Sequence, residues 1–304
     1  MALDTQPMET LPAMKISVVI LNWNGEKMLS HYLPSVVRYS ALPDCEVVVA
    51  DNGSTDHSID VLHRDFPTVR IIALPENYGF AEGYNRALAH IDSTYTVLLN
   101  SDVEVTEGWL EPLAQYMDAH PDVVAVQPKI LSDRDRTRFE HAGAAGGYIN
   151  ALGYPYCRGR ILWWTAKDKG QYDSIVPVDW CSGACMLVRT AAYKEQGGLD
   201  AGFFAHMEEI DLCWRLRRHG WKLACVPEAK VYHLGGGSLD YSNPRKTYLN
   251  FRNNLWMLRK NLPRGKYLCV AAVRAVLDNA TALIYLVMGR AALAKAIWQA
   301  RKEV

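Results

Sequence analysis

The chain has 304 residues, of which 49% are apolar, and it carries 33 basic (Lys and Arg) and 33 acidic residues. This balance excludes a strongly basic nucleic-acid-binding protein, and the length suits one large enzyme domain or two modest ones. The seven cysteines lack any CxxC pair, so the sequence indicates neither a disulfide framework nor a zinc ribbon and favours a reducing cytosol. Residues 1–14 are polar, contain proline and resemble no signal peptide, which predicts a loose leader.

Four apolar runs in the first half of the chain predict strands buried on both faces. They cover residues 15–22, 45–50, 69–74 and 95–99. Apolar residues at helical spacing lie between them, and Pro34 predicts a kink or a break in the first helix, over residues 26–38. Strands that alternate with helices predict an α/β fold with a largely parallel sheet and right-handed crossovers.

Each predicted strand ends in polar residues. These are Asn22 and Asn24 after the first strand, Asp51 after the second, Asn77 and Gly79 after the third, and Asn100, Ser101 and Asp102 after the fourth. Because ligands of open α/β sheets bind beyond the carboxyl ends of the strands, we expect these residues to line one pocket. The alternatives are local: Asp102 also fits a turn or the cap of a helix beginning near residue 109, and residues 77–79 also fit a simple turn.

Two common nucleotide-binding designs are missing from the sequence. No GxGxxG follows the first strand, and no GxxxxGK[ST] occurs anywhere. This argues against a dinucleotide-dependent dehydrogenase and against a P-loop enzyme. A different nucleotide-binding design is therefore needed.

Six segments together resemble a known family. They are VVILNWNG, VVVADNGSTD, NYGFAEGYNRAL, LLNSDVEV, GGLDAGFFAHMEEIDLCWRLRRHGW and VYHLGGGS. In this order they resemble the motifs of glycosyltransferase family 2, the inverting nucleotide-sugar transferases of the GT-A fold, and among them most closely the rhamnosyltransferases of surface polysaccharide assembly. The resemblance implies a GT-A domain over residues 15–242 with a mostly parallel central sheet and flanking helices. The remaining residues, 243–304, are expected to form a C-terminal helical extension.

The resemblance implies a metal site at the tip of the fourth strand. Asn100, Ser101 and Asp102 occupy the place of the family's DxD motif, with Asn in place of the first Asp. Mn²⁺ or Mg²⁺ held there would offset the charge that develops on the leaving diphosphate. His233 ends a late predicted strand where the family often places a metal-binding histidine, although a lone histidine is also a common structural residue. An imidazole ligand would favour Mn²⁺.

Recognition of a UDP- or dTDP-sugar follows from the same resemblance. Asp51 is expected to accept the N3–H of uracil or thymine, with Asn22 and Asn24 nearby. The floor under the ribose and diphosphate is expected to include Asn77, Gly79 and Asn85.

The acidic cluster of Glu208, Glu209 and Asp211 precedes a predicted helix over residues 212–219. EExDLCWR resembles the family's ED-x-D motif, whose second acid is the general base, so Glu209 is expected to take that role with Glu in place of the usual Asp. Glu208 and Asp211 are expected to orient it or to cap the helix. The alternative is purely structural, because an acidic start and a basic end are what the helix dipole favours.

The acceptor site is expected between the sheet and this cluster. The stretch 131–180 is rich in glycine and aromatic residues, and Trp163, Trp164 and Trp180 could stack on sugar rings or equally belong to a core. Residues 178–189 resemble the family's segment under the acceptor sugar, which makes Asp179 a candidate for binding hydroxyl groups.

The last sixty residues have another character. Residues 246–259 are basic and aromatic, and residues 267–288 are apolar but interrupted by Arg274, Asp278 and Asn279. Charges at the middle of a membrane cost ~2.5–3.5 kcal/mol each, which argues against a spanning helix. Peripheral contact with a membrane through residues 246–304 remains open beside packing on the catalytic domain or on a second copy in a homodimer.

The sequence therefore predicts an enzyme that transfers a sugar from a UDP- or dTDP-sugar to a hydroxyl of a growing cell-surface or lipid-linked glycan, in the cytoplasm or at the inner face of the cell membrane. A nucleotidyltransferase of similar fold is the first alternative, but LNWNGEK lacks the Gly-rich basic loop expected of it. A catalytically silent glycan-binding module is the second, and the departures at Asn100 and Glu209 favour it.

Overall fold

The structure is a computed structural model that describes residues 15–141, 143–161, 164–235 and 243–304. Within these residues a nine-stranded sheet has the order β11-β13-β6-β12-β4-β1-β2-β3, with β5 paired to β13. The strands of this sheet are β1 (Ile16–Asn22), β2 (Cys45–Asn52), β3 (Arg70–Leu74), β4 (Tyr95–Asn100), β5 (Val103–Val105), β6 (Val123–Ser132), β11 (Val176–Pro177), β12 (Cys185–Arg189) and β13 (Lys222–His233).

The first four strands are parallel neighbours, as the sequence predicts, so their carboxyl ends share one edge. The register places Asn22 opposite Asp51 on the adjacent strand. The second strand is longer than predicted, because Asp51 and Asn52 still pair with β3. The second half of the sheet is mixed, since β12 lies antiparallel between β4 and β6 whereas β13 runs parallel to β6.

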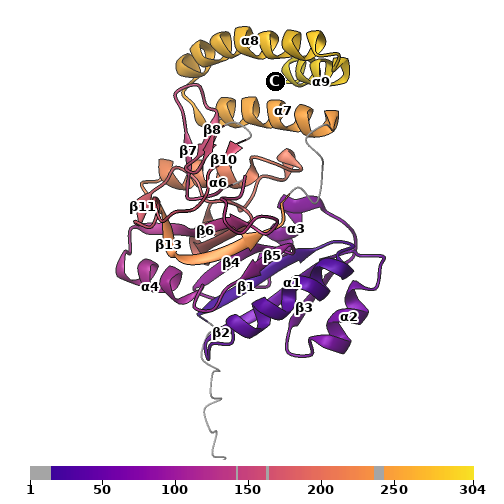
Figure 1. Ribbon diagram of the computed structural model, residues 1–304, viewed down its shortest axis with the longest axis vertical. Coiled ribbons are helices and arrows are strands. Elements are labelled where there is room, and N and C mark those ends of the chain that lie inside the picture. Colours follow the sequence, from indigo (N-terminus) through magenta and orange to yellow (C-terminus); the bar gives the residue numbers. More distant parts are fainter. Residues whose placement is uncertain (1–14, 142, 162–163, 236–242) are drawn as a thin grey trace, which may run out of the picture.

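Helices cover both faces of the sheet (Figure 1). One face packs against α1 (Glu26–Tyr39), α2 (Ser58–Asp65) and α4 (Glu111–Ala119). The other packs against α3 (Gly79–Leu88), α5 (Thr190–Glu195) and α6 (Glu208–Arg218). Two short two-stranded sheets, β7 (Gly147–Ile149) with β8 (Pro155–Cys157) and β9 (Arg160–Ile161) with β10 (Trp164–Thr165), lie in the stretch before β11, and a short 3₁₀ helix (Ala201–Phe203) precedes α6.

Of the two outcomes predicted at Pro34, a kink or a break, the break does not occur. The first helix continues to Tyr39, because Leu29, Leu33 and Val36 are buried against the sheet and this packing outweighs the backbone hydrogen bond that proline removes. The predicted start of the later helix is wrong, because α6 begins at Glu208 instead of after the acidic cluster. The cluster therefore lies in the first turn of the helix.

Three helices follow the sheet and form a layer at one end of the molecule (Figure 1). They are α7 (Pro244–Asn261), α8 (Arg264–Val287) and α9 (Ala291–Lys302). By length and composition α8 could cross a membrane: it contains a window with a mean hydropathy of 1.6, of which only 22% is buried.

The charges that interrupt the apolar sequence of α8 are turned inward. Arg274 and Asp278 are both 1% exposed and form an ion pair of 3.3 Å. Asp278 also pairs with Arg301 of α9 at 2.6 Å, and the Arg274 guanidinium donates to the carbonyl of Leu152 at 3.2 Å. These charges hold α8 against its neighbours and leave its outer face apolar.

Candidate active site

The tips of β1 and β2 are joined by side-chain hydrogen bonds. Asn22 Nδ2 donates to Asp51 Oδ1 at 3.0 Å and to Ser54 Oγ at 3.2 Å, while the Ser54 N–H donates to Asp51 Oδ2 at 2.9 Å. Asn22 and Asp51 are buried, and Asn22 Oδ1 has no hydrogen-bond partner among the described residues. A buried acceptor without a donor is costly in a protein interior, so this tip is suited to a ligand that brings one.

Asn24 fixes the loop that follows β1. Its backbone has a φ of 50°, and its side-chain oxygen accepts hydrogen bonds from the N–H groups of Thr55 and Asp56 at 2.7 and 3.3 Å. Asp56 in turn accepts from the N–H groups of Glu26 and Ser58, the first residues of α1 and α2. This network links the first two strand tips to the helices behind them.

The third tip is held by Asn52, which the sequence analysis did not single out. Its Nδ2 donates to Asn77 Oδ1 at 3.1 Å and to the Gly79 carbonyl at 3.0 Å, and its Oδ1 accepts from the Tyr78 N–H at 3.0 Å. Gly79 has a φ of 76°, so this segment is a turn that requires glycine as well as a neighbour of the pocket. The only sequence signal for Asn52 is its place in the polar run that ends β2.

Asn85 does not belong to this group of bonds. Its side chain donates to the Leu199 carbonyl at 2.7 Å and accepts from the Tyr193 hydroxyl at 2.8 Å and from the Leu199 N–H at 2.9 Å. It therefore joins α3 to the segment after α5, which leaves the expected contact with the nucleotide without structural support.

The fourth tip brings Asp102 and His233 together. Asp102 Oδ1 lies 3.1 Å from His233 Nε2, which is also 3.5 Å from Asn100 Nδ2, and the backbone pairing of β13 with β5 sets this approach. Ser101 lies between Asn100 and Asp102 on the chain and is partly exposed. On the other side, Glu140 Oε2 is 3.7 Å from His233 Nδ1; the sequence offered no signal for this carboxylate.

Electrostatics at this tip favour a charged pair. Burial lowers the pKa of His233, but hydrogen bonds and negative charge from Asp102 and Glu140 outweigh burial and raise that pKa to about 10. Burial raises the pKa of Asp102, yet His233 outweighs it and the net direction is downward. The described residues contain no group of three or more His, Cys, Asp or Glu side chains arranged to hold a metal ion. Protein ligands for a cation at this tip are therefore few.

Glu208 and Glu209 occupy the first turn of α6 and differ in accessibility. Glu208 is buried, whereas Glu209 is partly exposed. Burial raises the pKa of Glu209 to about 7, and burial together with the charge of Glu209 raises the pKa of Glu208 well above its ordinary value. A carboxylate with a pKa near neutrality suits a general base.

Glu209 lies close to the fourth tip. Gly183 packs against its side chain, because a Cβ at residue 183 would be 3.6 Å from Glu209 Cβ. The next residue, Ala184, accepts a backbone hydrogen bond from Asn100 at 3.0 Å. The two residues before β12 thus connect the base candidate to the strand tip that carries Asp102.

A strained turn presents this acidic pair. Phe204, His206 and Met207 have φ values of 64°, 70° and 78°, a region that residues other than glycine rarely occupy. The buried amide of Asn253 on α7 donates to three backbone carbonyls of the turn 203–206 at 2.7–2.9 Å. Strain of this kind persists only where surrounding structure holds it, and it concentrates at functional sites.

Asp211 connects α6 to α7. It is fully buried and accepts from Arg215 Nε at 2.8 Å, from Lys260 Nζ at 2.8 Å and from Asn261 Nδ2 at 2.7 Å. These partners lie on α6 and α7, so Asp211 fastens the two helices together. No hydrogen bond of the described structure joins it to Glu209.

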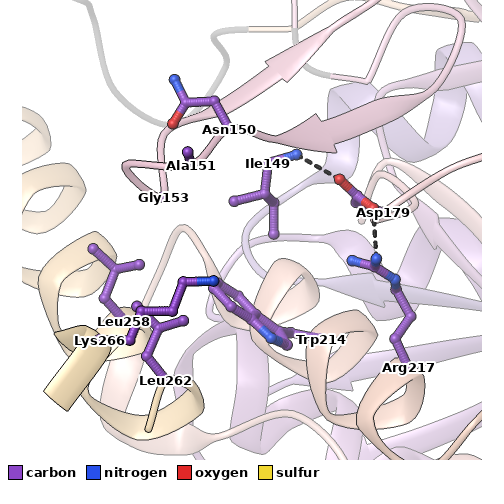
Figure 2. Close-up of a pocket in the computed structure, with 10 residues that line it drawn as sticks. All are labelled: Ile149, Asn150, Ala151, Gly153, Asp179, Trp214, Arg217, Leu258, Leu262 and Lys266. Carbon is purple, nitrogen blue, oxygen red and sulfur yellow. Dashed lines mark hydrogen bonds and ion pairs between the residues drawn. The ribbon is translucent and has the colours of Figure 1, made fainter. Parts of the chain in front are cut away.

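A cavity of about 260 Å³ lies where α6 meets the helical layer (Figure 2). Its lining comes from the turn after β7, from Asp179, and from α6, α7 and the start of α8. Asp179 Oδ2 accepts from the Ile149 N–H at 2.8 Å, and its Oδ1 pairs with Arg217 at 2.8 Å. Asp179 is therefore the acceptor-site candidate that faces a cavity.

The tryptophan candidates lie elsewhere. Trp180 is buried, donates to the Tyr148 carbonyl at 3.0 Å and covers Gly147 so closely that a Cβ there would lie 2.1 Å from its ring. It is a core residue. Trp164 is exposed on the short β9–β10 pair, and Trp163 lies outside the described residues.

A sheet of this order, with polar tips along the carboxyl edge and a general-base candidate beside them, defines a glycosyltransferase of the GT-A class. The chain belongs to glycosyl transferase family 2, whose profile matches residues 17–196. The family, the fold class and the enzymatic activity expected from the sequence are thereby confirmed.

Similarity to individual glycosyltransferases is consistent with this family. The chain is 30% identical over 235 residues, 72% of its length and 75% of the relative's, to N-acetylglucosaminyl-diphospho-decaprenol L-rhamnosyltransferase of Mycobacterium tuberculosis. The mannosyltransferase PcManGT of Pyrobaculum calidifontis, solved with GDP-Man and Mn²⁺, matches 99% of this chain and 79% of its own with a TM-score of 0.58 and 15% identity. GalNAc-T7, solved with UDP, GalNAc and Mn²⁺, matches 82% of this chain but 48% of its own, with a TM-score of 0.61 and 16% identity. The two solved structures show the fold.

Proposed function

We propose that this glycosyltransferase moves a sugar, with rhamnose as the first candidate, from a UDP- or dTDP-sugar to a hydroxyl of a lipid-linked glycan. The observation that carries the proposal is Glu209, a carboxylate with a pKa of about 7 beside the tip that holds Asp102. The relative from M. tuberculosis supports the choice of sugar and acceptor through its name.

Inverting transfer is a single displacement in this proposal. Glu209 removes the proton from the acceptor hydroxyl as its oxygen attacks C1 of the donor sugar from the face opposite the nucleotide. The C1–O bond to the diphosphate breaks and the nucleoside diphosphate leaves with its electron pair. Asp51 and Asn22 bind the pyrimidine, and the turn at Asn77 supports the ribose and diphosphate.

Asp102 and His233 would hold Mn²⁺ or Mg²⁺ in this site. A carboxylate oxygen and an imidazole are suitable ligands, and such ions commonly complete their coordination with substrate phosphates and water. When bound, the ion would stabilise negative charge on the leaving diphosphate. Because His233 ligates only as neutral imidazole, binding of the ion would release a proton from it.

We further propose peripheral contact with the inner face of a membrane through residues 246–304. The outer face of α8 exposes apolar side chains, among them Leu268, Val276, Leu283, Ile284, Val287 and Met288. Residues 243–304 contain twelve Lys and Arg residues but two acidic ones. Apolar exposure with basic surroundings matches anionic lipid, whereas two copies of this face in a homodimer would bring like charges together.

The test is an assay of UDP- and dTDP-sugars with a sugar carried on a prenyl diphosphate. Transfer with release of nucleoside diphosphate, lost in Glu209→Gln and reduced by EDTA, is the expected result. Release of pyrophosphate from a nucleoside triphosphate and a sugar phosphate would instead identify a nucleotidyltransferase. Glycan binding without turnover of any donor would identify a silent module.

A further inference from the structure

The cavity of Figure 2 is lined by α6, the helix that begins with the base candidate, and by the start of α8, the helix with the exposed apolar face. Arg217 lines it from a position eight residues beyond Glu209 on α6, which is about 12 Å along the helix axis. Lys266 lines it from the first turn of α8. Two residues later, Leu268 begins the exposed apolar face of that helix.

Two basic side chains, Arg217 and Lys266, line the cavity, and they differ in their partners. Arg217 is held by Asp179, but Lys266 makes no ion pair or side-chain hydrogen bond recorded for the described residues. Figure 2 shows the Lys266 side chain directed into the cavity, above an aromatic and aliphatic wall. That wall consists of Trp214, Leu258 and Leu262. Lys266 is an exposed residue, so an anionic group that enters the cavity from solvent can reach its ammonium.

The helices that line the cavity indicate which anionic group it binds. A lipid-linked acceptor must place its sugar hydroxyl at Glu209 and its lipid in the membrane, and the cavity is lined by α6 and α8, the two helices that carry Glu209 and the exposed apolar face. We propose that the cavity binds the diphosphate of a prenyl-diphosphate-linked acceptor, with Lys266 and Arg217 contacting phosphate oxygens. Asp179 fixes the Arg217 guanidinium for this contact, and the prenyl chain leaves along α8. This inference rests on the proposed function.

The experiment compares two acceptors with the same sugar in the absence of membranes. One carries farnesyl diphosphate and the other carries a neutral octyl chain. Lys266→Met keeps the aliphatic stem and removes the charge, and Lys295→Met, an exposed lysine of α9, is the matched control. For Lys266→Met we expect the KM of the diphosphate acceptor to rise by about 10-fold to 100-fold, as for loss of a charged hydrogen bond, with kcat at saturation and the KM of the octyl glycoside unchanged. Lys295→Met should match the wild type with both acceptors.

Three results would overturn the proposal. The first is an unchanged KM for the diphosphate acceptor. The second is an equal rise for both acceptors, which would point to the sugar or to the fold. The third is a Lys266→Met protein that binds anionic vesicles less well but uses the diphosphate acceptor normally, which would assign Lys266 to phospholipid headgroups.

A second measurement separates this inference from the proposed function. If the wild type transfers to neither acceptor, calorimetry with farnesyl diphosphate in the presence of saturating dTDP or UDP still examines the cavity, because the nucleotide occupies the donor site. Binding that weakens in Lys266→Met and persists in Lys295→Met supports the cavity as a diphosphate site. Equal binding by all three proteins contradicts it.

Discussion

Glu208 and Glu209 are neighbours on the chain, and their surroundings raise the pKa of both carboxyl groups. Burial, together with the charge of Glu209, raises the pKa of Glu208 well above its ordinary value. Glu209, partly exposed and with a pKa of about 7, is the one that changes charge in the physiological range. The two carboxyl groups influence each other's ionisation, and Glu209 is the one that solvent and substrate can reach.

The first prediction is a rising pH profile. Because the base must be deprotonated, kcat should increase with pH through a midpoint near 7, and Glu209→Gln should lower kcat by about 10²–10⁴-fold with nucleotide affinity unchanged. Steady-state kinetics from pH 5 to 9 measures this. A loss of equal size in Glu208→Gln would place the base elsewhere in the cluster.

The same shift has a consequence for stability. A carboxyl group whose pKa is raised by folding favours the folded state at pH values below its ordinary pKa, and this contribution is lost as the pH rises through 7. We therefore compare the melting temperature of Glu209→Gln with that of the wild type at two pH values. The melting temperature of the variant minus that of the wild type should be more positive at pH 8 than at pH 4. A melting-temperature difference that does not depend on pH would show that folding does not raise the pKa of Glu209.

Asp51, at the tip of β2, is expected to contribute to nucleotide affinity. Since its two oxygens also join the tips of β1 and β2, Asp51→Ala would disturb the fold as well as the site. Asp51→Asn keeps the side-chain volume and one of the two acceptor oxygens, so it disturbs the fold less, and it should weaken binding of UDP and dTDP by about 1.5–3 kcal/mol, the contribution of a hydrogen bond to a charged acceptor. Calorimetry with both nucleotides, beside a melting curve, measures it. Equal affinities for wild type and variant would remove Asp51 from base recognition.

Residues at strand tips could be predicted because a polar run after an apolar run is a local signal. This signal predicts Asn22, Asp51 and Asp102 as site residues, and the structure brings the first two into direct contact. Glu140 and Asn253 could not be found, since each acts on a residue far away in sequence. Long-range contacts of single polar side chains leave no periodic pattern.

At the scale of elements, α7 holds the turn that presents the base. Asn253→Ala removes the amide that binds three carbonyls of the turn 203–206, so we expect kcat to fall by about 10-fold to 100-fold through misplacement of Glu209. Donor affinity should stay the same. Asn250→Ala, one helical turn earlier and partly exposed, is the matched control.

A shift of the kcat midpoint away from pH 7 in Asn253→Ala would accompany this misplacement, because the burial that raises the pKa of Glu209 depends on the turn. A lower melting temperature with an unchanged kcat and midpoint would reduce Asn253 to a purely structural residue.

The parallel half of the sheet could be predicted from the sequence, whereas the other half could not. Alternation of strands and helices indicates that β1 to β4 are parallel and joined by right-handed crossovers, but it does not give their order, in which β4 lies beside β1 and not beside β3. Insertion of β12 between β4 and β6 depends instead on pairing across more than fifty residues, for which the short run 185–189 carries no signal. The continuation of α1 past Pro34 likewise follows from tertiary packing.

At the scale of the molecule, the exposed face of α8 predicts reversible membrane binding. Val276→Asp should reduce sedimentation with vesicles that contain anionic lipid by at least about 10-fold, because it places a charge on an apolar side chain that is 70% exposed. Ile161→Asp, at 77% exposure on β9, should bind as the wild type does. Transfer to a soluble acceptor should persist in both.

Extraction by carbonate would show peripheral contact, whereas resistance to carbonate would show that α8 spans the bilayer. Concentration-dependent dimerisation that Val276→Asp abolishes, with vesicle binding intact, would assign the face to a second copy of the chain.

The uneven distribution of charge has one more consequence. Because the chain is balanced overall, the basic excess of α7 to α9 is matched by an acidic excess in the rest of the chain, and α7 to α9 lie at one end of the long axis of the molecule. Such a molecule is an electric dipole, and the field of an anionic surface exerts a torque on it within a Debye length, about 8 Å at physiological ionic strength. The field turns the α8 end toward the surface before contact is made. Added salt would therefore slow arrival more than it would hasten departure, since apolar burial holds the seated molecule.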